Sequence, residues 1–370
     1  MVAAAAVKPP SGWWASRWRR LNGGARIHGV DLARGLAIVG MLAAHLIAIE
    51  TDFSFGDPSS WIAVVDGRSS ILFATLAGVS LGLVTGGATP LRAETLLTAR
   101  ARIVIRAFLI WFLGLMLIEL GVPVFVILPA YAILFLLSLP FLALSARTLL
   151  VIAAALAAAM PFVVDAIDRS PLWATPLGND LGLLIGWHYP FPVWLAFVLV
   201  GIAVARAGIT RLDVQLWALG GGLALALVGY GTDALLGQGP MTVWTADPHS
   251  SGVLEIIGSG GFALAVLATC LLVCRGMVTW VVLPLRAVGS MPLSAYTAQI
   301  VAWALVASIA LDRVADLAGF RALDPFWPMT LALIATATLW ALAVGRGPLE
   351  WVLDRLTRLV RVPSALNVRR

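Results

Sequence analysis

Charged residues are scarce in this chain: they make up 12% of its 370 residues, whereas 61% are hydrophobic. A water-soluble domain carries roughly 25% charged residues, because its surface must be hydrated. About half of that charge is missing here, which excludes an ordinary soluble globular domain. The mean hydropathy of +0.96 agrees. Most of the surface is therefore expected to face lipid.

The chain has only two cysteines, Cys270 and Cys274, which stand four residues apart in one apolar segment. Neither falls in an aqueous loop, where structural disulfides and cysteine-based metal sites are usually found. We interpret both as small packing residues and expect no bound metal.

We expect no cleavable signal peptide either. The first 26 residues contain five basic residues and no apolar run of sufficient length. The first hydrophobic helix is therefore expected to serve as an uncleaved anchor. The basic residues in question are Lys8, Arg17, Arg19, Arg20 and Arg26.

What the chain has in abundance is long apolar runs. Ten of them, each about 17 to 25 residues long, are sufficient to cross a bilayer as helices. They predict an all-α, polytopic transmembrane bundle of about ten helices. Only Gly121 separates the third run from the fourth, which predicts a tight helical hairpin. The runs lie near 31–50, 66–86, 102–120, 122–144, 148–164, 191–207, 214–235, 252–274, 286–311 and 326–345.

The distribution of charge predicts how these spans are oriented. With the N-terminus in the cytoplasm, cytoplasmic segments hold 21 of the 25 basic residues, and 14 of the 19 acidic residues fall on the outer side. An excess of Lys and Arg on the cytoplasmic side is the usual signature of orientation. Both termini are thus predicted to be cytoplasmic, in a multi-pass protein of the plasma membrane. Orientation also accounts for the net charge of +6, so nucleic acid is not expected as a partner.

The chain divides into three parts. A basic cytoplasmic tail covers residues 1–30, a transmembrane domain covers 31–345, and residues 346–370 form a second cytoplasmic tail. The second tail alternates apolar residues with arginines, which is typical of an amphipathic helix on the membrane surface.

Ionisable side chains inside a span cost at least ~2.5–3.5 kcal/mol each on insertion, so they are the first functional candidates. Asp31, Arg34 and His45 share one face of the first span, by their spacing of three and eleven residues. Asp31 and Arg34 neutralise one another if they pair, and a purely structural role is an equal alternative. His45 has no charged neighbour on its own helix. It is either a general base or a buried packing histidine.

Further polar residues lie near the ends of other spans. Asp66 and Arg68 are expected at the outer interface, at about the depth of His45; Asp66 is alternatively a simple helix cap. Arg100, Arg102 and Arg106 begin the third span. They either mark orientation or hold the phosphates of a cytoplasmic nucleotide.

The segment before the eighth span adds His249 and Glu255 to the outer side, where they are expected to join a site with His45. Loop polarity alone is the alternative explanation of His249. The glycines of Gly258-Ser259-Gly260-Gly261 do not form a phosphate loop, because no strand precedes them; they are expected to permit close helix contact. Tyr296 and Gln299, three apart in the ninth span, are candidates for hydrogen bonds within the bundle.

Several strings in this order resemble a known family. RIHGVDLARGLAIVGMLAAHL is similar to the first helix of the YeiB-like and heparan-α-glucosaminide N-acetyltransferase-like membrane proteins. DGRSSILFATLAGVSLGL, RARIVIRAFLIWFLGL, YPFPVWLAFVLVGIAVAR, PHSSGVLEIIGSGGFALAV, VGSMPLSAY and GRGPLEW follow in the expected order. The resemblance covers about residues 26 to 351 and extends to the acyltransferase-3 superfamily.

The resemblance implies a transmembrane acyltransferase. It would move an acetyl or acyl group from cytoplasmic acyl-CoA to an extracytoplasmic glycan or small-molecule acceptor, with the acyl-CoA as co-substrate and no permanently bound cofactor. A homodimer is one candidate assembly. In this hypothesis His45 deprotonates the acceptor or is transiently acylated, and Asp66 or Glu255 orients its ring. The remaining candidates are Arg34, Arg100, Arg102 and Arg106 for the donor, and Arg68, His249, Tyr296 and Gln299 for the acceptor.

Two other functions fit the sequence. A secondary transporter would use Asp31, Arg34, Asp66 and Glu255 as an ion or proton relay, although no internal repeat is visible. In a non-catalytic membrane scaffold, the same polar residues would only lock helices together.

Overall fold

The computed structural model describes residues 12–24, 26–49, 53, 56–237 and 243–359. Lys8, the end of the first predicted span at residue 50, and residues 360–370 of the predicted second tail lie outside the described residues. Within them the chain is helical, with no strand. The α-helices are α1 (Trp13–Asn22), α2 (His28–Leu46), α3 (Arg68–Val84), α4 (Ala93–Ile118), α5 (Leu128–Ser138), α6 (Ala146–Asp168), α7 (Pro176–Ile185), α8 (Phe191–Ala207), α9 (Leu212–Leu236), α10 (Val253–Val273), α11 (Val278–Val281), α12 (Leu283–Ser290), α13 (Pro292–Ala310), α14 (Leu317–Ala322), α15 (Phe326–Ala343) and α16 (Pro348–Arg358). Three short 3₁₀ helices are η1 (Pro58–Val65), η2 (Leu139–Ala143) and η3 (Pro171–Ala174).

The predicted polytopic helical bundle is confirmed. Eight described segments are long and apolar enough to cross a membrane, and the apolar stretches Leu128–Ala143 and Phe191–Ala207 are shorter. These two coincide with the fourth and sixth predicted spans, so each of the ten apolar runs has a helix.

Two predicted boundaries are wrong, each for a local backbone reason. The third and fourth spans are separated by residues 119–127, because Gly121 has a left-handed φ of +67° and Pro123 cannot continue a helix. The ninth predicted span is broken at Met291, with φ −137° and ψ 58°, because Pro292 disfavours a helical conformation in the preceding residue. The break divides it into α12 and α13.

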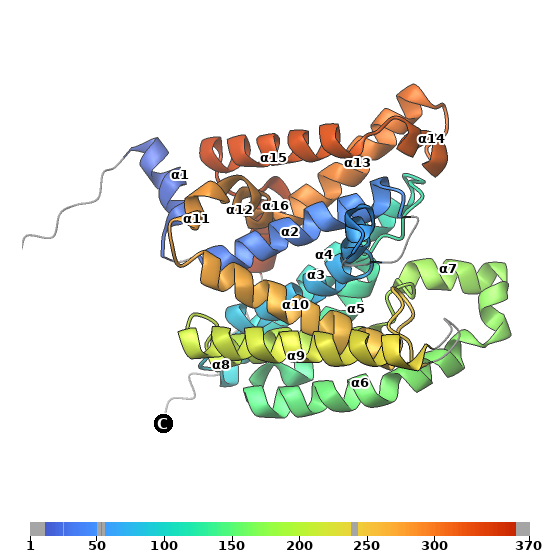
Figure 1. Ribbon diagram of the computed structural model, residues 1–370. Coiled ribbons are helices and arrows are strands. Elements are labelled where there is room, and N and C mark those ends of the chain that lie inside the picture. The colour runs from blue at the N-terminus through green and yellow to red at the C-terminus, as the bar shows by residue number, and fades with distance from the viewer. Residues whose placement is uncertain (1–11, 25, 50–52, 54–55, 238–242, 360–370) are drawn as a thin grey trace, which may run out of the picture.

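The helices define two ends of the bundle (Figure 1). α1 and α11 lie at one end, and α7 and α14 at the other. The turn before α16 also belongs to the first end, because a Cβ at Gly345 would lie 3.3 Å from Arg20 Cδ in α1. We call the end with α1 and α16 the inner end, and the end with α7 and α14 the outer end.

Close backbone contacts set the positions of the polar helices. A Cβ at Gly289 of α12 would overlap the carbonyl oxygen of Asp31, so α2 and α12 meet backbone to backbone. Gly261 of α10 meets the backbone of α9 in the same manner, and a Cβ at Gly229 of α9 would overlap the backbone nitrogen of Gly258. The expectation that glycines of this cluster permit close helix contact is therefore confirmed for Gly258 and Gly261.

Candidate functional site

The outer end contains a small polar cavity of about 120 Å³, the outer cavity. It lies where the end of α2, the turn between η1 and α3, the loop before α10, and α13 meet. Gly67 makes the turn with a left-handed φ of +63°, and this turn carries Asp66 next to the loop that holds His249. The lining residues that carry chemistry are His45, Asp66, Ser69, Ser70, Tyr189, His249 and Tyr296.

His249 and Asp66 form an imidazole–carboxylate pair across this cavity. His249 Nε2 lies 3.2 Å from Asp66 Oδ1, although 183 residues separate them in sequence. Burial of the ring lowers the pKa of His249. The hydrogen bond with Asp66 and the charges of Glu255 and Asp66 together outweigh this effect, so the pKa of His249 lies above its ordinary value. A pair of this kind fixes the orientation of the ring.

Glu255 organises the loop that presents His249. Its carboxylate accepts the backbone N–H groups of His249 and Ser251, both at 2.7 Å, and the hydroxyl of Ser250 at 3.2 Å. His249 and Ser251 have left-handed φ values of +63° and +55°, and these bonds offset the strain. Glu255 is buried and does not line the outer cavity.

His45 lines the outer cavity near the end of α2, where its carbonyl accepts Nε–H of Arg321 at 3.0 Å. Within the described part of the chain, its ring donates no hydrogen bond to either carboxylate expected to orient it. Asp66 pairs with His249, and Glu255 binds the loop. Asp66 therefore contacts the neighbouring imidazole of His249 and not the ring of His45.

A much larger cavity of about 630 Å³, the inner cavity, lies at the inner end between α3, α4, α5 and α16. Arg102 and Arg106, four residues apart on α4, line it together with Asp354 and Arg358 of α16. Arg100 does not line it, because its Nε–H donates to the carbonyl of Leu139 at 3.1 Å.

A middle cavity of about 150 Å³ lies between the other two and is mainly apolar. It shares Ser80, Arg106 and Phe135 with the inner cavity, and Tyr296 with the outer cavity. The three cavities thus form a series from the arginine-rich inner end to His45 and His249 at the outer end.

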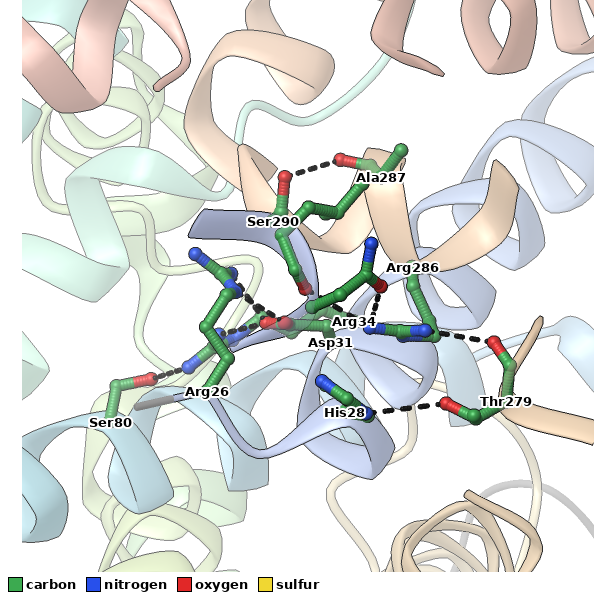
Figure 2. Close-up of polar contacts among 11 residues, drawn as sticks. Arg26, His28, Asp31, Arg34, Ser80, Thr279, Arg286, Ala287 and Ser290 are labelled. Carbon is green, nitrogen blue, oxygen red and sulfur yellow. Dashed lines mark hydrogen bonds and ion pairs between the residues drawn. The ribbon is translucent and has the colours of Figure 1, made fainter. Parts of the chain in front are cut away.

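Arg34 lines the middle cavity and belongs to a buried ionic network (Figure 2). Asp31, 2% exposed, accepts two bonds of 2.7 Å from Arg26 and lies 3.3 Å from Arg34. Arg34 also donates to the hydroxyl of Ser80 at 2.6 Å. The predicted pairing of Asp31 with Arg34 is confirmed, but the two-fold contact comes from Arg26. No sequence pattern indicates this contact, because Arg26 precedes the helix.

Glu350 is a further lining residue that the sequence analysis missed. It projects from α16 into the middle cavity and accepts the backbone N–H groups of Leu293 and Ser294 at 2.7 and 3.1 Å. These are the first N–H groups of α13, which lack partners within the helix. The available signal was an acidic residue near the start of an amphipathic helix, just after a Gly-Pro pair. That signal does not indicate which helix Glu350 would contact.

Two acceptor-site candidates lie elsewhere. Arg68 donates to the Tyr230 hydroxyl at 2.7 Å and to the carbonyl of Ala63 at 2.9 Å, so it ties α3 to α9. Gln299 is buried, and its Oε1 has no hydrogen-bond partner among the residues that the structure describes. Neither lines the outer cavity, whereas Tyr296 does.

No cluster of three or more His, Cys, Asp or Glu side chains suited to a metal ion occurs among the described residues. Cys270 and Cys274 are free thiols.

Comparison with known families gives two overlapping matches. Residues 26–236 match the family described as heparan-alpha-glucosaminide N-acetyltransferase, catalytic. Residues 204–360 match a family described as a protein of unknown function (DUF418). No curated protein and no solved structure matches the chain. The first match covers more than half of the sequence. It includes helices α2, α3, α4 and α5, which form walls of the three cavities.

Proposed function

This chain belongs to the heparan-alpha-glucosaminide N-acetyltransferase catalytic family of multi-pass membrane proteins, and we propose that it is an acyl-CoA-dependent transmembrane acyltransferase of the plasma membrane. It would take an acetyl or other short acyl group from acyl-CoA at the inner end. It would transfer this group to a hydroxyl or amine of a glycan or small molecule at the outer end.

The series of three cavities is the observation that carries the proposal. Phosphates of CoA are too polar to cross a bilayer, and arginine is suited to binding them. Arg102 and Arg106 at the inner cavity meet that need, and Arg34 adds a third cation at the middle cavity. The mainly apolar middle cavity suits the pantetheine arm and the acyl group.

The outer cavity supplies the proton chemistry. The neutral His249 ring, held through Nε2 by Asp66, keeps its other nitrogen free to accept the proton of the acceptor O–H or N–H. The acceptor atom bonds to the thioester carbonyl carbon, the C–S bond breaks, and the CoA thiolate leaves and is protonated. His45, on another wall of the same cavity, is the alternative base or a transient acyl carrier.

A radiolabelled acetyl-CoA assay on purified detergent-solubilised protein tests this function. His249→Ala is expected to lower label transfer or thioester loss about 10²-fold or more, and a loss of that size in His45→Ala would show that His45 is the base or acyl carrier. His188→Ala is the matched control, because His188 lies at the outer end but stacks on Phe125 and does not line the outer cavity. Absence of binding and turnover in the unmodified protein, with several acyl chain lengths, would contradict the proposal.

A secondary transporter is the second candidate, because cavities in series also suit the passage of a solute. The carboxylates of its supposed relay, however, have separate partners: Asp31 pairs with arginines, Asp66 with His249, and Glu255 with its own loop. Substrate-coupled flux in liposomes without acyl-CoA consumption would favour the transporter. A non-catalytic scaffold predicts neither flux nor turnover.

A further inference from the structure

Tyr296 occupies a distinctive position in the series of cavities. It is the one lining residue common to the middle and outer cavities in the part of the chain that the structure describes. The residue is only 4% exposed, so Tyr296 is packed within the bundle while it borders both cavities.

Among the described residues, one hydrogen bond holds the phenol in this place. The backbone N–H of Ile127 donates to the Tyr296 hydroxyl at 3.2 Å. Ile127 lies in the connection just before α5 and lines the outer cavity, so the bond attaches the ring to the cavity wall. The phenol is an acceptor in this bond, which leaves its own proton available for a ligand.

We propose that the ring of Tyr296 is the partition between the donor passage and the acceptor chamber, and that it restricts transfer to short acyl groups. The specificity claim rests on the proposed acyltransferase function, whereas the partition does not. Only one neutral hydrogen bond has to break for the ring to turn aside for a two-carbon acyl group. A long acyl chain would have to keep the ring displaced during the whole transfer step. The outer cavity of about 120 Å³ would also have no room for such a chain.

Tyr131 provides the matched control. It is also a buried tyrosine, and it lines the middle cavity but not the outer one. Its hydroxyl contacts the carbonyl of Ser70 at 3.5 Å. Truncation of Tyr131 therefore enlarges the donor passage without removing the partition.

Cysteine accessibility tests the partition without any need for catalysis. In a background lacking Cys270 and Cys274, Ser69→Cys reports on the outer cavity and Ser80→Cys on the inner and middle cavities. A small membrane-impermeant ammonium methanethiosulfonate is added to right-side-out or inverted vesicles. Each cysteine should be modified from one face only, and the two faces should be opposite.

Tyr296→Leu should then expose each cysteine to the other face as well, with at least a tenfold gain in the rate of modification. Tyr131→Leu should not do so. The partition is overturned if the reporter cysteines are modified from both faces while Tyr296 is intact. It is also overturned if Tyr296→Leu brings no gain in the rate of modification. Tyr296→Phe, which keeps the ring and loses only the hydroxyl, is expected to retain one-sided access.

Acyl specificity is measured separately. Tyr296→Leu should raise the ratio of kcat/KM for octanoyl-CoA to that for acetyl-CoA at least tenfold, and by clearly more than Tyr131→Leu, which enlarges the donor passage but keeps the partition. An unchanged ratio in an active Tyr296→Leu enzyme overturns the specificity claim. If the unmodified protein consumes no acyl-CoA, the proposed function and the specificity claim fail together, while the accessibility measurement still decides the partition.

Discussion

Arg206 is buried, and within the described part of the chain its two terminal nitrogens bond only to carbonyl and hydroxyl oxygens, with no carboxylate among them. Its guanidinium donates to the carbonyls of Gly82, Gly87, Thr85 and Leu142 and to the Thr85 hydroxyl. It thus closes the turn after α3 and attaches that turn to η2. The last carbonyl groups of a helix have no donor within the helix, and here a single arginine supplies several of the missing donors.

We expect Arg206→Met to destabilise the protein by about 2–4 kcal/mol, because several buried carbonyl oxygens lose their donor. The midpoint of thermal unfolding in detergent should fall clearly. Arg147→Met is the control, since Arg147 is exposed in the first turn of α6. Equal midpoints for the two variants would contradict this role of Arg206.

The pair of His249 and Asp66 predicts a pH dependence. The folded pKa of His249 is raised above its ordinary value of 6.5, so protonated His249 stabilises the folded state. That contribution is fully present below the ordinary pKa and is lost as the pH rises through the raised folded pKa. Both side chains are partly exposed, at 48% and 34%, which limits the effect to about 1 kcal/mol or less.

Unfolding midpoints of the native protein and of Asp66→Asn measure this dependence between about pH 5.5 and pH 8.5. The difference between the two should be largest at the acidic end and shrink toward the alkaline end. A difference that grows with pH would contradict the assignment. Acyl transfer should have the opposite trend, because only the neutral ring accepts a proton.

At the scale of elements, the contact between α2 and α12 holds Asp31 and Arg34 in position. Gly289→Ala would force a methyl group onto the carbonyl of Asp31, and backbone on both sides prevents an easy shift. We expect a loss of about 1–3 kcal/mol, as for other overpacked sites, measured as a lower unfolding midpoint. Gly220→Ala in α9 is the control: it has open space for a Cβ, and alanine is the better helix former. A neutral Gly289→Ala would show that the two helices can separate.

α16 is a wall of both the inner and middle cavities, and Glu350 docks it onto the start of α13. Glu350→Gln keeps the shape but weakens the charge-assisted bonds to the N–H groups of Leu293 and Ser294. Under the proposed function, KM for acyl-CoA should rise several-fold with a smaller change in kcat, because a loosened α16 disturbs donor binding. Trp351→Phe, at an exposed position on the same helix, should leave both constants nearly unchanged. A fall in kcat alone would place the role of Glu350 in the chemical step instead.

The sequence predicts the elements well and the partners of their side chains poorly. Apolar length alone locates a helix for every predicted span, because a membrane requires such runs. Spacing also contains information that can be used more fully: Arg102 and Arg106, four apart, share a face of α4, whereas Arg100 is two residues away and points to η2. The pairing of His249 with Asp66 has no such signature, because it arises only when two distant loops meet.

At the scale of the whole molecule, some of the basic residues that predict the orientation also line the inner cavity. Composition cannot distinguish an arginine that marks orientation from one that lines a cavity. Arg206 and Arg106 both count as cytoplasmic basic residues, yet one closes a turn and the other lines two cavities. Only the three-dimensional arrangement separates the two roles.

The predicted orientation of this bundle leads to a last test. α1 and α16 lie at the same end, as an even number of spans requires, and the basic excess predicts that this end is cytoplasmic. A fluorescent protein that folds only in the cytoplasm, fused after residue 359, should therefore be bright, and alkaline phosphatase at the same place should be inactive. Alkaline phosphatase inserted in the turn between α6 and η3, at the outer end, should be active. The reverse pattern would place the arginines of the inner cavity outside the cell, where acyl-CoA is not supplied, and would remove the physical basis of the proposed donor site.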